Sequence, residues 1–389
     1  MAKIKDNLII QLVLAVIVGL GLGLVASENI IGIIMTIKHI LGQFIFFCVP
    51  LIIIGFITPS ITGLKSNASK MLGSALIIAY ISSVGAALFA TISGYLIIPK
   101  LNIISNPEGL RALPELVFQL NIPQIMPVMS ALVLSIVMGL TIIWTNSKTL
   151  ENIFNEFNNV MMVTVKKMVI PVLPLFIATT FAGLAYEGGI TKQFPVFISV
   201  ILIVIVGHFI WMALLYAVGG AMSKENPMEV IKHYGPAYLT AVGTMSSAAT
   251  LPVALDCARK SKVLDREVVD FTIPICSTIH LCGSVLTETF FVMTVSQVLY
   301  GTLPSLSNML VFIILLGVFA IGAPGVPGGT VMASLGLITG VLGFDQSGVA
   351  LMLTIFALQD SFGTACNIVG DGAIAMMLTG LYKKEKVKA

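Results

Sequence analysis

Charged residues are scarce in this sequence. They make up 10% of its 389 residues, whereas 57% are hydrophobic and the mean hydropathy is +1.03. A soluble domain carries about 25% charged residues, so this composition excludes a soluble globular protein. The net charge of +3 is too small to indicate a nucleic-acid partner. The length instead allows about eight to ten membrane segments of ~20 residues with their loops.

Patterns for catalysis and metal binding are lacking as well. The five cysteines are scattered and form no CxxC pair or Cys/His cluster, so neither a disulfide framework nor a zinc site is predicted. No nucleophile–base constellation appears, so we expect neither an enzyme nor an organic cofactor. The N-terminal apolar run lacks a convincing small-residue cleavage site, and we interpret it as a first membrane span, not a removed signal.

Long apolar runs separated by short charged segments predict a multi-pass protein of the plasma or cell inner membrane. Lysines gather near both ends of the chain, and the positive-inside rule therefore places both termini in the cytoplasm. The segment at 100–127 is expected to be an extracytoplasmic excursion. A polar helix at 149–160 is expected along the membrane interface. The predicted spans begin with 8–26, 31–62, 71–98, 128–144, 168–186 and 194–218, and another starts near 268.

The most informative polar residues lie inside the apolar stretch 351–378. Asp360, Thr364, Asn367 and Asp371 are spaced four, three and four residues apart. At 3.6 residues per turn, this spacing puts all four on one stripe of a helix. Ionisable groups placed this way in a membrane helix usually mark a substrate or ion path.

Two irregular stretches accompany this stripe. Residues 235–254 predict two short helical halves around a hydroxyl-rich bend, and residues 319–330 are too rich in proline and glycine for a regular helix. Irregular backbone at membrane depth must be buried in protein or line a cavity. The first bend precedes a broken span, the second precedes the polar span, and we interpret the pair as an inverted repeat. Paired interrupted segments of this kind indicate the binding site of a transporter.

With these motifs, the chain resembles the dicarboxylate/amino acid:cation symporters, which include archaeal aspartate transporters and mammalian glutamate and neutral amino acid transporters. Residues 246–252 resemble the tip of the first hairpin, 322–329 that of the second, and 360–371 the last helix. The resemblance implies an all-α polytopic membrane protein with eight transmembrane helices, two re-entrant helical hairpins and inverted repeats. It also implies a homotrimer that works as an elevator-type transporter.

The resemblance further implies a division into scaffold and transport domain. The implied division assigns 1–70 to the scaffold, 71–98 to the transport domain, 99–190 to the scaffold and trimerisation region, and 191–389 to the transport domain, with hairpins at about 226–259 and 305–345.

The family's site residues carry over by position. Asp360 takes the position that binds the substrate amino group, and Asn367 with the tip around Ser247 takes that of the α-carboxylate. The chemistry agrees, because an ammonium group needs a buried carboxylate and a carboxylate needs N–H donors. The full implied set of substrate contacts is Ser246, Ser247, Val326, Gly328, Asp360, Gly363, Thr364 and Asn367.

A sodium site is implied at Asp371 and Asn367, with backbone carbonyls near Ser277 and His280. Cages built mostly from carbonyl oxygens suit hard cations. Sodium and/or protons are therefore the expected coupling ions, and the expected partners are a small amino acid, the lipid bilayer and two further copies of the chain.

The sequence departs from the family at the position that selects the substrate. Gly363 stands where members with acidic substrates have an arginine, and Met245 stands where some relatives have one instead. A second substrate carboxylate would then lack its charge partner, at a cost of several kcal/mol. We therefore expect a small neutral amino acid, with Gly363 leaving room for its side chain. The alternatives are an acidic amino acid or dicarboxylate, if another arginine reaches the pocket, and an uncoupled facilitator or channel.

A second departure lies at residues 280–284. The family's Asn-Met-Asp-Gly-Thr motif here reads His-Leu-Cys-Gly-Ser, which predicts the loss of a deep sodium site. Glu288 matches the glutamate assigned to proton coupling in mammalian relatives, and a carboxyl in a dry site holds its proton more firmly. Helical spacing puts His280, Ser284 and Glu288 on one face, so we assign Glu288 and His280 to proton coupling. Purely structural roles remain as alternatives. Glu288 would then only form a hydrogen bond to a neighbour such as His280, and His280 would be a packing residue. Ser246 and Ser247 would be small residues that allow helices to pack closely.

Overall fold

The computed structural model describes residues 8–63, 70–101, 103, 111–188, 190–323, 325 and 327–386. Within these residues all regular secondary structure is helical. The first half contains α2 (Leu8–Val25), α3 (Glu28–Gly63), α4 (Lys70–Ile97), α5 (Val128–Thr145), α6 (Lys148–Thr164), α7 (Ile170–Glu187) and α8 (Ile190–Ser223). The second half contains α9 (Met228–Ile231), α10 (Gly235–Thr244), α11 (Ser247–Arg259), α12 (Arg266–Ile279), α13 (Cys282–Tyr300), α14 (Leu306–Gly322), α15 (Gly329–Gly340) and α16 (Gln346–Lys386).

The prediction of a multi-pass membrane protein is confirmed by the lengths of these helices. Six helical segments of the described chain are long and apolar enough to cross a membrane, and α2, α5, α14 and α15 contribute shorter apolar helices. Many large apolar side chains of α8 are exposed, among them Leu202, Val206 and Phe209. Exposed apolar surface on this scale is expected for helices in contact with lipid.

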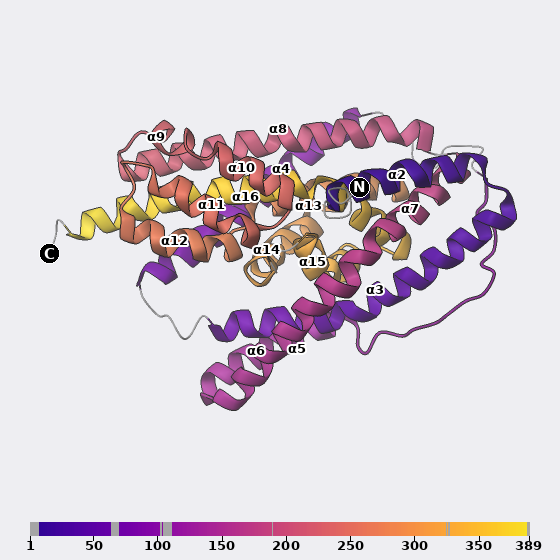
Figure 1. Ribbon diagram of the computed structural model, residues 1–389, viewed down its shortest axis with the longest axis horizontal. Coiled ribbons are helices and arrows are strands. Elements are labelled where there is room, and N and C mark those ends of the chain that lie inside the picture. Colours follow the sequence, from indigo (N-terminus) through magenta and orange to yellow (C-terminus); the bar gives the residue numbers. More distant parts are fainter. Residues whose placement is uncertain are drawn as a thin grey trace.

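The polar helix at 149–160 differs from the expected separate interfacial element. It belongs to α6, which continues through a π-helical turn at Val165–Val169 into α7. The joined segment Lys148–Glu187 spans 40 residues. Prolines occur only after the π turn, at Pro171 in the first turn of α7 and at Pro174 inside it. No proline therefore ends the helix between α6 and the π turn. In Figure 1, α6 projects from the body of the molecule beside α5.

The described part of the expected excursion, residues 111–127, contains no helix. It is fastened along α3 by side-chain bonds. Thr36 accepts a hydrogen bond from the Val117 amide (2.9 Å), and Gln43 accepts one from the Ile122 amide (3.3 Å). These contacts satisfy backbone donors of a long segment that has no secondary structure of its own.

Both predicted hairpins are present. The first consists of α10 and α11, which meet at Met245 and Ser246, and the second consists of α14 and α15, which meet around Gly328. Ser246 is the N-cap of α11 and accepts a hydrogen bond from the Ala249 amide. Gly328 has φ +71°, a left-handed conformation that suits glycine. In Figure 1 the first hairpin lies towards the end of the molecule where the chain ends, and the second lies nearer the middle.

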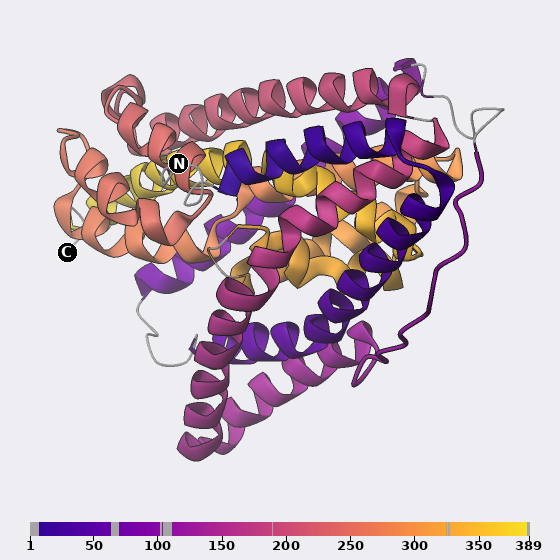
Figure 2. The same cartoon turned by 45° about the vertical axis from the view of Figure 1, so that its right-hand side comes forward.

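Helix α16 forms the centre of the second half of the chain. It packs against α8, α10, α11, α12, α13 and α15. In an apolar 18-residue stretch of α16, 89% of the residues are buried, whereas in the corresponding stretch of α8 the buried share is 39%. Figure 2 shows α16, in yellow, enclosed by the orange and pink helices. A polar group on α16 is therefore surrounded by protein.

Candidate functional site

The polar stripe predicted on the last helix faces the protein interior. Asp360, Thr364, Asn367 and Asp371 all lie on α16, and their exposed fractions are 3%, 5%, 2% and 0%. The other faces of this part of the helix are buried as well, so they contact protein and not lipid. Burying carboxyl groups is costly unless partners or ions compensate their charge.

The two hairpin tips meet beside Asp360. The amide of Gly328 in the second tip donates to Asp360 Oδ2 (2.7 Å), and the hydroxyl of Ser246 in the first tip donates to the carbonyl of Gly325 in the second (2.8 Å). Ser247 is buried at the start of α11. The structure thus brings together most of the expected substrate contacts. Val326 lies outside the described residues.

Asn367 closes the N-terminus of α13. Its Oδ1 accepts hydrogen bonds from the amides of Gly283 (2.7 Å) and Ser284 (3.2 Å), and its Nδ2 donates to Ser284 Oγ (2.9 Å). The N-cap residue Leu281 offers no side-chain cap, so Asn367 satisfies amide donors that the helix leaves open. One hydrogen of its NH₂ group remains for a carboxylate.

Gly363 does not face an open space, contrary to expectation. A Cβ at this position would lie 3.3 Å from both the Cα and the amide nitrogen of Ser284. The glycine therefore allows α16 to approach the backbone of α13. Any extra room for a substrate side chain must come from neighbouring positions.

Gly283 packs even more closely, and this leads to a stability prediction. A Cβ at Gly283 would lie 2.4 Å from Cys366 Cβ and 2.5 Å from the Gly363 carbonyl oxygen. We expect Gly283→Ala to lower the free energy of unfolding by about 1–3 kcal/mol through overpacking. Gly21→Ala on α2 is the control, because nothing lies within 4 Å of its added Cβ. Thermal unfolding in detergent compares the two, and equal melting temperatures would contradict the predicted close approach.

The break between α12 and α13 changes the interpretation of His280. Its backbone is extended (φ −110°, ψ 96°), so helical spacing does not carry from His280 into α13, although it still holds between Ser284 and Glu288 within α13. The expected common face of His280, Ser284 and Glu288 is wrong for this reason. His280 instead contacts Asp371 through Nδ1 (2.9 Å) and Ser82 on α4 through Nε2 (2.8 Å).

Glu288 has a different partner from the one considered in sequence. It lies on α13 with an exposed fraction of 0%, and Ser334 on α15 donates a hydrogen bond to its Oε1. Its Oε2 has no hydrogen-bond partner within the described part of the chain. Glu288 therefore links α13 to the second hairpin, and the suggested pairing with His280 is not found.

Sequence reasoning assigned no role to His208, which the structure places at the same site. Its Nε2 donates to the carbonyl of Gly283 (3.0 Å) and lies 2.9 Å from Thr287 Oγ1. The Gly283 peptide is thus held between His208 on α8 and Asn367 on α16. The sequence offered one signal for this role: His208 is a single histidine in an otherwise apolar span. A histidine is costly to bury there without a polar partner.

In the part of the chain that the structure describes, no buried lysine or arginine accompanies these groups. Among the described residues the buried carboxyl groups are Glu288, Asp360 and Asp371, and no lysine or arginine is buried. The sequence contains three arginines. Arg111 lies over the Tyr186 ring at 5.7 Å, and Arg259 pairs with Asp270 at 2.7 Å. The third, Arg266, begins α12.

Comparisons with known proteins identify the relatives of this chain. A sequence model described as the sodium:dicarboxylate symporter family matches residues 8–381. The chain is 29% identical over 238 residues to excitatory amino acid transporter 2 of Mus musculus. The matched region covers 59% of this chain and 41% of the relative. It is 28% identical over 242 residues to excitatory amino acid transporter 1 of Ambystoma tigrinum, covering 61% and 44%. Each match thus spans less than half of the relative's length.

Proposed function

Because this chain belongs to the sodium:dicarboxylate symporter family, a family of transporters and not of enzymes, we propose that it is a secondary active symporter that imports a small neutral amino acid. The observation that carries this proposal is the meeting of both hairpin tips at Asp360. A buried carboxylate there provides the partner for a substrate ammonium group, and the amide of Asn367 lies two turns further along the same helix.

The choice of a neutral substrate rests on the missing cation. Glutamate or a dicarboxylate brings two carboxylates, of which the second would need a buried positive group. No lysine or arginine is buried among the described residues, and Met245, at the first tip, presents an apolar side chain that is 2% exposed. The α-carboxylate of a neutral amino acid needs only amide and hydroxyl donors, which Asn367 and Ser247 provide.

We expect small neutral amino acids to stabilise the purified protein against heat more than glutamate or aspartate does. Ligands that bind the folded state raise the melting temperature, and saturating binding corresponds to a shift of about 2 °C or more. The measurement scans all twenty amino acids, each with and without sodium. Malate and succinate are included as dicarboxylates, and glycine and D-alanine test the need for a side chain and for the L configuration.

A second candidate is an acidic amino acid or dicarboxylate symporter. The names of the family and of the relatives favour it, because the family is named for dicarboxylates and the relatives are named as excitatory amino acid transporters. The same thermal scan separates the two candidates. Aspartate, glutamate or malate as the strongest stabiliser would establish the second candidate and exclude the first.

For coupling we propose protons, acting through Glu288, together with fewer sodium ions than in sodium-driven relatives. Among the described residues, Glu288 has one hydroxyl partner and no buried lysine or arginine near it, and a protonated carboxyl fits such a site without an unbalanced charge. An uncoupled facilitator would equilibrate the substrate, whereas a symporter concentrates it. Uptake into proteoliposomes above the external concentration separates these two possibilities.

We further propose the assembly and movement implied by the family. The chain forms a homotrimer in the plasma membrane with both termini in the cytoplasm. Its transport domain, made of residues 71–98 and 191–389, slides against a scaffold made of residues 1–70 and 99–190. Crosslinking in native membranes tests the trimer, because a purely monomeric product is incompatible with it.

A further inference from the structure

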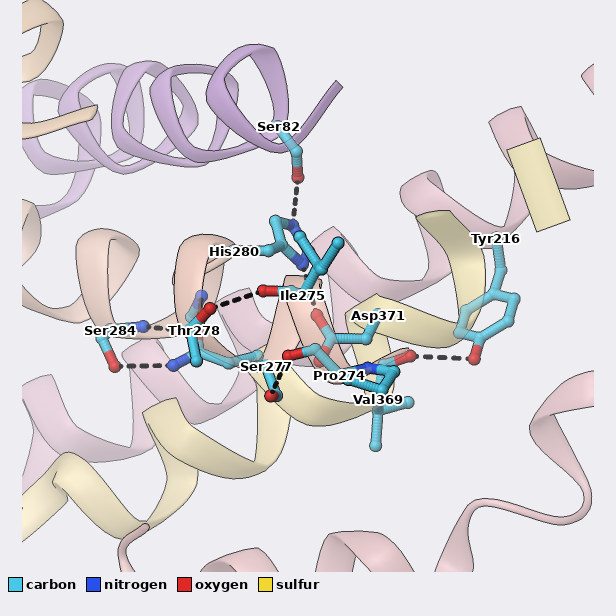
Figure 3. A network of polar contacts seen from close by, with 12 residues as sticks. Ser82, Tyr216, Pro274, Ile275, Ser277, Thr278, His280, Ser284, Val369 and Asp371 are labelled. Atoms are coloured by element: carbon cyan, nitrogen blue, oxygen red, sulfur yellow. Dashed lines mark hydrogen bonds and ion pairs between the residues drawn. The ribbon is translucent and has the colours of Figure 1, made fainter. Parts of the chain in front are cut away.

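Asp371, His280 and Ser82 form a row of contacting side chains that connects α16 to α4. His280 Nδ1 lies 2.9 Å from Asp371 Oδ1, and Ser82 Oγ lies 2.8 Å from His280 Nε2. Figure 3 shows the imidazole ring held between Ser82 on α4 and Asp371 on α16. The exposed fractions of His280 and Asp371 are both 0%, so neither contact competes with bulk water.

The fold provides a fitted position for the ring. A Cβ added at Gly370 would lie 2.9 Å from His280 Cε1 and 3.3 Å from Cys282 Sγ. Gly370, the residue before Asp371, therefore leaves the space that the imidazole fills. The position of the ring depends on this glycine as well as on its two polar contacts.

The resemblance implies a sodium ion at Asp371, but the surrounding residues do not fit one. Sodium is a hard cation, and such ions take several oxygen ligands. Here Oδ1 of Asp371 is bonded to a ring nitrogen, the sulfur of Cys282 lies beside the ring, and the Cys276 carbonyl accepts the His280 amide at 2.8 Å. Oδ2 of Asp371 has no hydrogen-bond partner in the described part of the chain, so only one of the two carboxylate oxygens remains for an ion.

We propose that the His280 imidazole takes the place of the sodium ion at Asp371, so that this chain binds no sodium there. The inference rests on the proposed function, because replacing a coupling ion has meaning only in a symporter. A side chain stays with the protein throughout the transport cycle, whereas a bound ion is released with the substrate. The Asp371 site therefore contributes no sodium to coupling, and substrate uptake is driven by ions bound elsewhere.

The experiment compares thermal unfolding in sodium chloride with unfolding in choline chloride at equal ionic strength, without substrate. We expect Asp371→Asn to show the same difference between the two salts as the wild type. His280→Asn exposes both carboxylate oxygens, and its sodium-dependent stabilisation should exceed that of the wild type by about 2 °C or more. His39→Asn is the control, since it makes the same change at a histidine on α3 that is hydrogen-bonded to the Leu120 carbonyl and not to Asp371.

Two outcomes would overturn the inference. One is a wild-type sodium response that Asp371→Asn removes, because Asp371 would then be a sodium ligand. The other is a folded His280→Asn variant whose sodium response equals that of the wild type. If His280→Asn does not fold, the comparison of Asp371→Asn with the wild type decides the question. Amino acid stabilisation of the wild type is recorded in parallel, so that failure of the proposed function is seen separately from failure at this site.

Discussion

The Asp360→Asn variant is expected to lose amino acid binding and transport while remaining folded. Asp360 is 3% exposed and accepts a hydrogen bond from the tip of the second hairpin. An asparagine keeps the size of the side chain but offers no negative charge to a substrate ammonium group in this buried site. We expect the affinity to fall by at least about 100-fold, which corresponds to ~2.7 kcal/mol.

Two measurements check this expectation: the melting-temperature shift caused by the best substrate, and uptake into proteoliposomes. The matched control is Asp345→Asn, which makes the same chemical change just before α16. Asp345 accepts hydrogen bonds from the Gly348 amide and the Tyr300 hydroxyl, and asparagine caps a helix about as well as aspartate. Asp360→Asn with wild-type affinity would remove the assignment of Asp360 to the substrate ammonium group.

The second large effect is expected for Glu288→Gln. In the proposed mechanism the wild type accumulates substrate when the outside of the vesicle is more acidic than the inside, because Glu288 carries a proton inward. Glutamine is nearly isosteric and still accepts the hydrogen bond from Ser334, but it cannot take up or release a proton. We expect the accumulation driven by the pH gradient to fall by about tenfold or more.

The measurement follows substrate uptake and internal pH in proteoliposomes under separate proton and sodium gradients. Glu229→Gln is the control, since Glu229 pairs with Lys232 on the protein surface, where ion pairs contribute little to stability. Glu288→Gln should leave the thermal shift caused by the substrate largely intact, which separates loss of coupling from loss of binding. An unchanged response to the pH gradient would contradict the assignment of Glu288.

Local pattern was sufficient to predict much of the fold. The two hairpins were visible because glycine, proline and small hydroxyl residues interrupt apolar runs, and such backbone cannot remain helical in lipid. The long last helix was visible because Asp360 and Asp371 occur at helical spacing within an uninterrupted apolar stretch. The junction of α6 and α7 was missed, because a π turn joins them without a sequence marker and polarity alone suggested a separate helix.

The site itself was predicted less completely. The positions of Asp360 and Asn367 on one buried stripe followed from spacing within a single helix. The role of Asn367 as a cap for α13 did not, because its partners Gly283 and Ser284 lie more than 80 residues away in the sequence. Helical spacing also gave a wrong grouping for His280, because it assumed a continuous helix through a break.

The sequence by itself determined that this protein belongs in a membrane, that two hairpins with interrupted helices precede a polar last helix, and that no arginine stands at either expected position. These properties depend on composition and on neighbours within a few turns. Only the tertiary structure decided that Ser334 is the partner of Glu288, and that His280 reaches Asp371, 91 residues away, and Ser82, 198 residues away. Side chains this far apart meet only when several helices pack together, and a buried polar group takes whichever partner that packing provides.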